Sequence, residues 1–240
     1  MQKILVAGAT GYLGGYILDE LKKQGYLVRA ITRNPEKLKV AHRNIDEIIT
    51  AEMTMPETLS GCCKDIDAVI TTVGITRQKD RLTYMDVDYR ANLNLLQEAE
   101  KNGIKKFMYI SVCNAEKISH LKIVEAKQKF TAALIASGMN YCIIKPTGFF
   151  SDMSDFLEMA RKGKVYLFGK GEYKMNPIGG RDLAEACVNA LKKTEQEISI
   201  GGPEILTHTQ IAEAAFQALN TPVKMIHIPS GMKNMLLWTL

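Results

Sequence analysis

The amino-acid sequence predicts a doubly wound α/β fold, in which helices cover both faces of a parallel sheet. The first observation is an alternation of short apolar runs with helix-length periodic segments, which is typical of a parallel sheet with crossover helices. The second is a glycine-rich turn that joins the first apolar run directly to the first helix. The third is size, because 240 residues, 46% of them hydrophobic and 24% charged, can bury one large core.

The first half of the chain carries the alternation most clearly. Strands are expected at Ile4–Ala7, Leu27–Thr32, Glu47–Thr50, Ala68–Val73, Phe107–Ser111 and Tyr141–Lys145. Helices are expected at Tyr12–Lys23, Asp86–Asn102 and Ile118–Ser137, each followed within two residues by a glycine that favours a helix end.

After Pro146 the alternation breaks. The sequence there predicts helices at 152–161, 182–191 and 210–219, the last capped by Thr207 or Thr209, an extended segment at 165–168, and turns at 169–171 and 201–203. We expect one domain over residues 1–240, to which residues 149–240 contribute a small substrate-side lobe. The sequence stops at Leu237-Trp238-Thr239-Leu240 without a stop signal, as a shortened chain would.

Composition narrows the class of protein. A net charge of +5 without a basic run favours anionic small ligands and gives no indication of nucleic acid. The apolar run before Gly8 is too short for a signal peptide, and no apolar stretch reaches the roughly 18 residues of a membrane span. Five cysteines without a CxxC pair and four scattered histidines predict reduced thiols and no metal site. We expect a cytoplasmic protein, or one inside an organelle if a transit peptide has been removed.

The glycine-rich turn predicts a dinucleotide site. Gly8-Ala9-Thr10-Gly11-Tyr12-Leu13-Gly14 lies between the first strand and the first helix, which is the context of the Rossmann phosphate loop. Gly8 permits the tight turn, Gly11 lets the backbone approach a pyrophosphate, and Gly14 lets the helix pack on the sheet. The N–H groups of Tyr12 and Leu13 then face the phosphates at the positive end of the helix dipole. A glycine-rich turn of another α/β protein is the alternative.

The end of the second strand favours NADP(H) over NAD(H). An NAD site usually has Asp or Glu about 20 residues beyond the loop, to bind the ribose 2′-hydroxyl. Thr32-Arg33-Asn34 holds no carboxylate, and Arg33 with Lys37 can face a 2′-phosphate. A solvated surface arginine is the alternative, and NAD(H) stays possible.

The fourth strand completes this edge of the predicted site. Thr72, Val73 and Gly74 follow its apolar core, beside the first strand at the point where strand order reverses. Ligands of open α/β sheets bind in the crevice at that point, and Gly74 would let the backbone approach a ribose.

These motifs resemble the atypical, extended short-chain dehydrogenase/reductases, which include NmrA-like and isoflavone-reductase-like members. The resemblance covers nearly the whole chain and rests on five sets of segments: Gly8–Gly14, Asp65–Ile70, Phe107–Ser111, Ile144–Phe149, and Asn176–Ile178 with Asp182–Ala184. It implies that Glu52, with Met53, lies against the adenine amine. It also implies that Pro146, Thr147, Gly148 and Phe149 cover the nicotinamide, although an ordinary Pro-Gly turn would look the same.

The catalytic residues of the family transfer only in part. Its Tyr-x-x-x-Lys pair corresponds to Ile123 and Lys127, so the tyrosine is absent. Its asparagine corresponds to Asp88, and its serine to Ser111, or to Val112 or Cys113 in another alignment. The missing tyrosine argues against epimerase or dehydratase chemistry by the family's usual route.

Lys127 is the principal catalytic candidate, with Ser111 beside it. The resemblance implies that Lys127 binds the nicotinamide ribose or acts as a general acid/base, and partial burial is expected to bring its pKa toward neutrality. A surface lysine on an amphipathic helix is the alternative. Two functions stay open: an NADP(H)-dependent reductase of a small carbonyl or enone substrate, or a non-catalytic NADP(H) sensor or assembly factor. The oligomeric state cannot be predicted.

Overall fold

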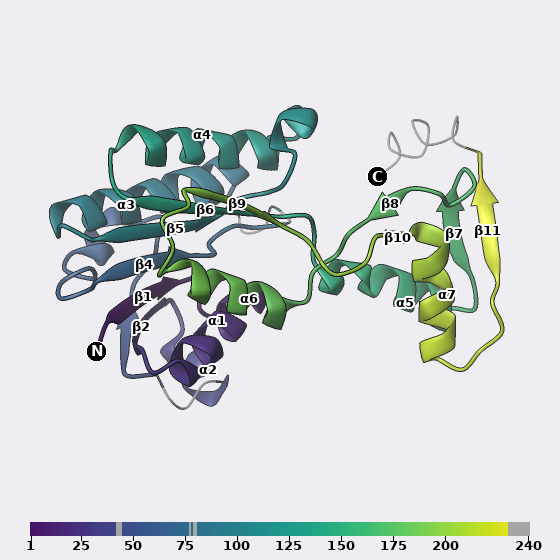
Figure 1. Ribbon diagram of the computed structural model, residues 1–240, viewed down its shortest axis with the longest axis horizontal. Coiled ribbons are helices and arrows are strands. Elements are labelled where there is room, and N and C mark those ends of the chain that lie inside the picture. Colours follow the sequence, from purple (N-terminus) through teal and green to yellow (C-terminus); the bar gives the residue numbers. More distant parts are fainter. Residues whose placement is uncertain (42–44, 77, 79–80, 230–240) are drawn as a thin grey trace. The chain divides into compact units, whose positions relative to one another are not determined.

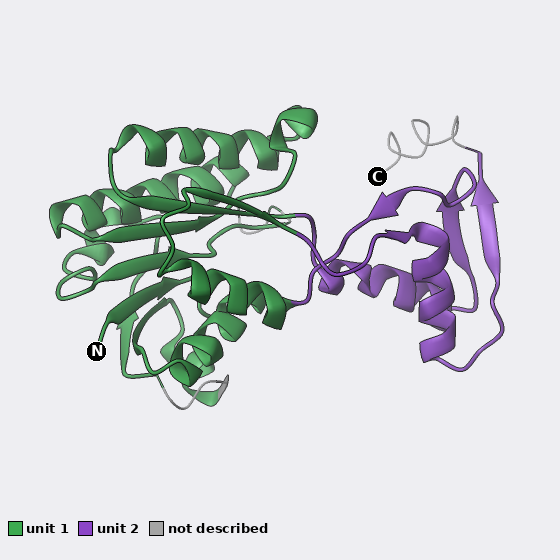
Figure 2. Cartoon of the chain, in the orientation of Figure 1, with its two compact units in different colours: residues 1–146, 180–200 green, residues 147–179, 201–240 purple. Residues whose placement is uncertain are grey.

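The computed structural model describes residues 1–41, 45–76, 78 and 81–229. The sequence end at Leu237–Leu240 lies outside this range. The described chain divides into two compact units, shown in green and purple in Figure 2: residues 1–146 with 180–200, and residues 147–179 with 201–240. Each unit has its own strands and its own apolar core.

The first unit is built on a seven-stranded sheet (Figure 1). Its order is β3-β2-β1-β4-β5-β6-β9, and every neighbouring pair is parallel. The strands are β1 (Lys3–Ala7), β2 (Leu27–Thr32), β3 (Glu47–Thr50), β4 (Ala68–Thr71), β5 (Lys106–Ile110), β6 (Tyr141–Pro146) and β9 (Glu197–Ile200). The predicted doubly wound parallel fold is confirmed, with strand order reversing between β1 and β4.

Helices cover both faces of this sheet. In Figure 1, α3 (Asn92–Lys101) and α4 (Lys122–Ala136) lie on one face, and α1 (Tyr12–Lys23) and α6 (Gly180–Ala190) lie on the other. The short α2 (Pro35–Ala41) follows β2. The core on the α3 and α4 side holds Phe107, Tyr109 and Phe130, with the Tyr109 and Phe130 rings edge to face at 4.6 Å.

Two predicted helices start differently in the structure. The segment expected at 86–102 opens as a π-helix, Met85–Ala91, before α3 begins. The segment expected at 118–137 begins at Lys122, after a 3₁₀ turn at Ala115–Ile118. The π-helix matters for function, because π-turns often occur at sites where a side chain must be aimed.

The second unit has a small core of its own. It contains α5 (Ser154–Arg161), β7 (Val165–Phe168), β8 (Lys174–Met175), β10 (Leu206–Thr207), α7 (His208–Ala218) and β11 (Met225–Ile228). β11 pairs with β7 in parallel and β10 with β8 antiparallel. Thr207 caps α7, since its hydroxyl accepts a hydrogen bond from the Gln210 N–H at 3.2 Å.

Residues 180–200 lie within the range 149–240 expected for the lobe, and the structure groups them with the first unit. The reason is that α6 packs against α1, and β9 extends the large sheet beside β6. The chain therefore leaves the first unit after Pro146, returns for one helix and one strand, and leaves it again.

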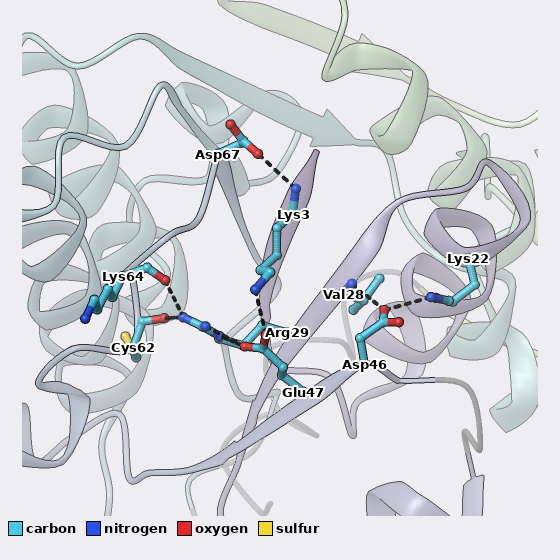
Figure 3. Close-up of polar contacts among 9 residues, drawn as sticks. All are labelled: Lys3, Lys22, Val28, Arg29, Asp46, Glu47, Cys62, Lys64 and Asp67. Carbon is cyan, nitrogen blue, oxygen red and sulfur yellow. Dashed lines mark hydrogen bonds and ion pairs between the residues drawn. The ribbon is translucent and has the colours of Figure 1, made fainter. Parts of the chain in front are cut away.

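A polar network ties the amino ends of the first strands together (Figure 3). The Arg29 guanidinium donates to the carbonyls of Cys62 and Lys64 at 2.9 and 2.7 Å and pairs with Glu47. Glu47 also accepts from Lys3 at 2.6 Å. Because Arg29 and Glu47 lie on β2 and β3, this network fixes the strand whose other end leads to Glu52.

Candidate dinucleotide site

The turn between β1 and α1 needs glycine at two positions for packing reasons. Gly8 has a φ of +81°, and a Cβ there would lie 2.4 Å from Thr72 Oγ1. A Cβ on Gly14 would lie 2.1 Å from the Gly8 carbonyl oxygen, so α1 could not approach β1 as it does. Thr72 contributes to the turn, since its hydroxyl donates to the Gly8 carbonyl at 3.3 Å.

Gly11 is less constrained by packing than Gly8 and Gly14. Its φ of −80° and ψ of 169° suit any residue, but a Cβ would lie 3.2 Å from the Gly8 carbonyl oxygen, which is tight and would need a small shift. Gly11 also lines a cavity at the N-terminus of α1. Glycine at this position would let a pyrophosphate approach the backbone.

This cavity has a volume of about 230 Å³. Nine of the predicted cofactor residues line it: Gly8, Thr10, Gly11, Arg33, Glu52, Met53, Thr72, Val73 and Gly74. The sequence reasoning missed eight more, mostly apolar: Ile31, Thr32, Ala51, Thr54, Ile75, Leu82, Val87 and Ala91. Seven of them flank the named motifs or lie on the π-helix, whereas Leu82 lies in the segment before it.

Arg33 and Glu52, the residues predicted to face the 2′-phosphate and the adenine, line the same cavity. Arg33 is 69% exposed and pairs with Glu52 at 3.4 Å. The other Glu52 oxygen accepts from the Thr54 N–H and hydroxyl at 3.2 and 3.0 Å. Lys37 is exposed on α2, whose first turn is held by Asn34 through the Lys37 N–H at 3.1 Å.

The remaining predicted cofactor residues lie elsewhere. Leu13 is buried on α1, and the Tyr12 hydroxyl accepts from the Gly180 N–H at 3.3 Å, which directs this ring toward α6. Pro146 ends β6, whereas Thr147–Phe149 begin the second unit. In that unit Ile178 donates to the Gly148 carbonyl at 2.9 Å. That these loop residues cover a nicotinamide stays a prediction.

Lys127 lies behind the wall formed by Gly74 and Ile75. Its ammonium is 3.2 Å from Asp88 Oδ1 and 3.4 Å from the Ile110 carbonyl. A Cβ on Gly74 would lie 3.3 Å from Lys127 Nζ and 2.5 Å from Asp88 Oδ1. Glycine at position 74 is therefore what allows the ion pair to sit against the cavity wall.

Asp88 and Tyr109 complete this buried cluster. The Asp88 side chain is 0% exposed, and its Oδ2 accepts from the Ile75 N–H at 3.1 Å. The ammonium of Lys127 lies over the Tyr109 ring at 5.4 Å, and the buried Tyr109 hydroxyl has no hydrogen-bond partner among the described residues. Ser111 directly follows Ile110 and is buried, with its N–H on the Ile144 carbonyl at 2.8 Å.

Burial acts against the charge of both partners in this pair. It raises the pKa of the Asp88 carboxyl, while Lys127 acts in the opposite direction. Burial has the largest effect on Lys127 and would lower its pKa, but interactions with Tyr109 and then Asp88 act in the opposite direction, and the pKa is raised. Burial also raises the pKa of the Tyr109 hydroxyl, so Asp88 is the partner that carries the opposing charge at neutral pH. The expected shift of the pKa of Lys127 toward neutrality is wrong.

Other chemistries find little support in the described part of the chain. No group of three or more His, Cys, Asp or Glu there is arranged to hold a metal ion, and the five cysteines are free. Within the same ranges no helix has the length and apolar character needed to cross a membrane.

Fold and cavity together define a dinucleotide-binding protein of the Rossmann type. A family model described as NAD(P)H-binding matches residues 8–194. The chain therefore belongs to this NAD(P)H-binding family, and the resemblance to the atypical short-chain dehydrogenase/reductases is confirmed.

Relatives of this chain have different functions. A chloroplastic divinyl chlorophyllide a 8-vinyl-reductase of Cucumis sativus is 30% identical over 253 residues, covering 95% of this chain and 60% of that protein. The photosystem II assembly factor Ycf39 of Guillardia theta is 30% identical over 189 residues, covering 78% of this chain and 60% of that protein. The chain thus spans about 60% of the length of these relatives.

Solved structures show the same fold at low sequence identity. An NADPH complex of the NADPH-dependent quinone oxidoreductase QOR2 of Escherichia coli has a TM-score of 0.81 at 18% identity, over 98% of this chain and 82% of that one. A UDP-glucose 4-epimerase of Thermotoga maritima has a TM-score of 0.78 at 20% identity, over 95% and 86%.

Proposed function

We propose that the protein is an NADP(H)-dependent oxidoreductase that acts on a small carbonyl or enone substrate. The proposal rests on the position of the Lys127 ammonium. It lies 3.2 Å from Asp88 Oδ1, on the side of Gly74 that a Cβ would occupy, and Gly74 lines the dinucleotide cavity. A buried lysine at that place can orient a nicotinamide ribose and deliver a proton.

The preference for NADP(H) rests on the end of β2. Arg33 lines the cavity where an NAD site would have a carboxylate, and Lys37 lies one turn further along on α2. The Arg33–Glu52 contact is long and exposed, so it is worth little and leaves the guanidinium available to a 2′-phosphate.

The reaction needs a hydride and a proton. The residues around Gly11 and Arg33 would hold NADPH, which when bound would supply the hydride for the electrophilic carbon of the substrate. Lys127, which stays protonated at neutral pH, supplies the proton to the carbonyl oxygen, or to the α-carbon of an enone. The vinyl reductase among the relatives supports the reduction of a C=C bond within this substrate class.

The test is NADPH oxidation with a panel of small aldehydes, ketones, quinones and enones. General acid help is typically worth about 10²–10⁴ in rate, so Lys127→Met is expected to lower turnover on that scale. NADPH affinity should change far less, because the proposed pyrophosphate contacts are at Gly11, away from Lys127. The converse variant, Ile123→Tyr, recreates the family pair one helical turn before Lys127. Turnover that survives Lys127→Met would remove the catalytic assignment.

One observation favours a second function. Position 123, where the family has its tyrosine, is isoleucine, and one set of relatives is described as an assembly factor. The alternative is therefore a non-catalytic NADP(H) sensor or assembly factor. It predicts NADPH binding without oxidation by any substrate in the panel, both in the parent protein and in Ile123→Tyr.

A further inference from the structure

We propose that Asp88 is a positioning residue, which keeps Lys127 charged and fixes its ammonium against the Gly74–Ile75 wall of the dinucleotide cavity. The inference rests on the proposed function in giving Lys127 its place in the reaction. It goes further by naming the group that controls the lysine.

The first argument is geometric. Asp88 makes two contacts with its two oxygens: Oδ2 accepts from the Ile75 N–H at 3.1 Å, and Oδ1 lies 3.2 Å from Lys127 Nζ. One carboxylate therefore connects the loop after β4 with α4. Since Gly74 and Ile75 line the cavity, a movement of this carboxylate would move both the wall and the lysine behind it.

The ammonium group of Lys127 has little freedom to move. It has three N–H donors, and one of them reaches the Ile110 carbonyl at 3.4 Å. Asp88 Oδ1 lies 3.2 Å from Nζ as an ion pair, without hydrogen-bond geometry. Because the Lys127 side chain is only 16% exposed, the ion pair and the hydrogen bond together hold the ammonium in place.

Asp88 and Lys127 also depend on each other electrostatically. A fully buried carboxylate is costly unless a cation neutralises it, and breaking such a pair by removing one partner is strongly destabilising. The titratable groups that act on Lys127 are Asp88 on the π-helix and Tyr109 on β5, and Lys127 is the one that acts on Asp88. With Tyr109 neutral near pH 7, the charge state of Lys127 depends on Asp88.

A comparison with asparagine separates the two roles of the Asp88 carboxylate. An asparagine at this position could accept the Ile75 N–H equally well but would carry no charge. The carboxylate is therefore not needed to hold the loop. What it adds is a negative charge 3.2 Å from the Lys127 ammonium.

The decisive variant is Asp88→Asn, which keeps the shape and the acceptor for Ile75 and removes the charge. Its matched control is Asp86→Asn, because Asp86 lies on the same π-helix but pairs with Arg90 at 3.0 Å. Lysines labelled with ¹³C at Cε are titrated by NMR between pH 7 and 10.5, and the Lys127 signal is assigned by its loss in Lys127→Met. Lys127→Met leaves a buried carboxylate, so Asp88→Asn/Lys127→Met serves if the single variant does not fold.

In the parent and in Asp86→Asn, Lys127 should stay charged across this range. In Asp88→Asn its titration midpoint should move into this range, because losing an opposite charge in direct contact lowers such a pKa by about 1–3 units. Turnover should then decline with pH in Asp88→Asn over a range where the parent and Asp86→Asn show no decline. A Lys127 signal that titrates alike in Asp88→Asn and the parent would overturn the inference.

The two proposals fail in different ways. A shifted Lys127 titration without turnover on any substrate would leave the control by Asp88 standing and remove the oxidoreductase. Turnover with an unmoved titration and an unmoved alkaline limb would keep the oxidoreductase and remove the role of Asp88.

Discussion

Replacing Gly11 by valine tests whether the glycine turn is the phosphate site. The backbone angles at Gly11 suit any residue, and a Cβ would approach only the Gly8 carbonyl oxygen, at 3.2 Å. The fold should therefore survive Gly11→Val. The valine would project into the space that a pyrophosphate needs, so dinucleotide binding should be lost.

The size of the effect follows from ligand linkage. NADPH at 100 times its dissociation constant stabilises the folded state by about 2.7 kcal/mol. For a domain of this size each kcal/mol moves the thermal midpoint by about 2–4 °C, so the parent should gain about 5–11 °C. Gly11→Val should gain nothing, and its midpoint without NADPH should fall by only about 2–4 °C, the effect of roughly 1 kcal/mol at a helix cap.

Thermal unfolding with and without NADPH, checked by calorimetric titration, measures both quantities. Gly14→Ala is the contrasting variant: its Cβ would lie 2.1 Å from the Gly8 carbonyl oxygen, so it should lose the fold itself. If Gly11→Val keeps the NADPH-induced rise in midpoint, the assignment of the turn to the pyrophosphate is refuted.

Three other predictions concern charge. Arg33→Ala should weaken NADP(H) binding by about 10–100-fold, from roughly 1.5–3 kcal/mol of lost charged contact, and leave NAD(H) binding unchanged; equal affinities of the parent for both would contradict it. Lys106 is buried and donates to the carbonyl of Ala190, the last residue of α6, at 2.8 Å. Lys106→Met should therefore lower the free energy of unfolding in urea by about 1–3 kcal/mol, and an unchanged urea midpoint would contradict this. Hydrogen bonds from Lys3, then Arg29, lower the pKa of Glu47. The stability that Glu47 contributes is therefore present above its ordinary pKa of about 4.3 and is lost as the pH falls through the lower folded value. In acid unfolding curves, the difference in stability between the parent and Glu47→Gln should close below that pH.

The sheet was predictable because its central strands are buried on both faces. Such strands are nearly continuous apolar runs. Across the whole chain, four predicted elements have the observed bounds: the helix at 12–23 and the strands at 27–32, 47–50 and 165–168. β9 was missed because Glu-Ile-Ser-Ile is a short edge strand that alternates exposed and half-buried residues. α2 was missed because it is short and only Leu38 among its described side chains is buried.

The site was predictable where motifs are local and not where distant segments meet. The glycine turn, Arg33 and the loop after β4 were each identifiable from their place beside a strand end. The pairing of Asp88 with Lys127 joins residues 39 positions apart through a π-turn, and helical spacing cannot indicate that contact. Gly74 held the one local signal, a glycine just after a strand, but the structure was needed to show what occupies the space of its missing side chain.

The cavity and the ion pair that bear on function both lie in the first unit. Every residue that lines the dinucleotide cavity belongs to the first unit, and so do Lys127 and Asp88. A vinyl reductase and an assembly factor both resemble this chain, so the fold by itself cannot decide between catalysis and sensing. A sensor could use Lys127 only to bind the nicotinamide ribose, whereas a reductase also needs it as a proton donor. The Asp88–Lys127 pair is therefore the place where the two functions differ. Lys127→Met should lower turnover by about 10²–10⁴ and keep NADPH binding if the protein is a reductase.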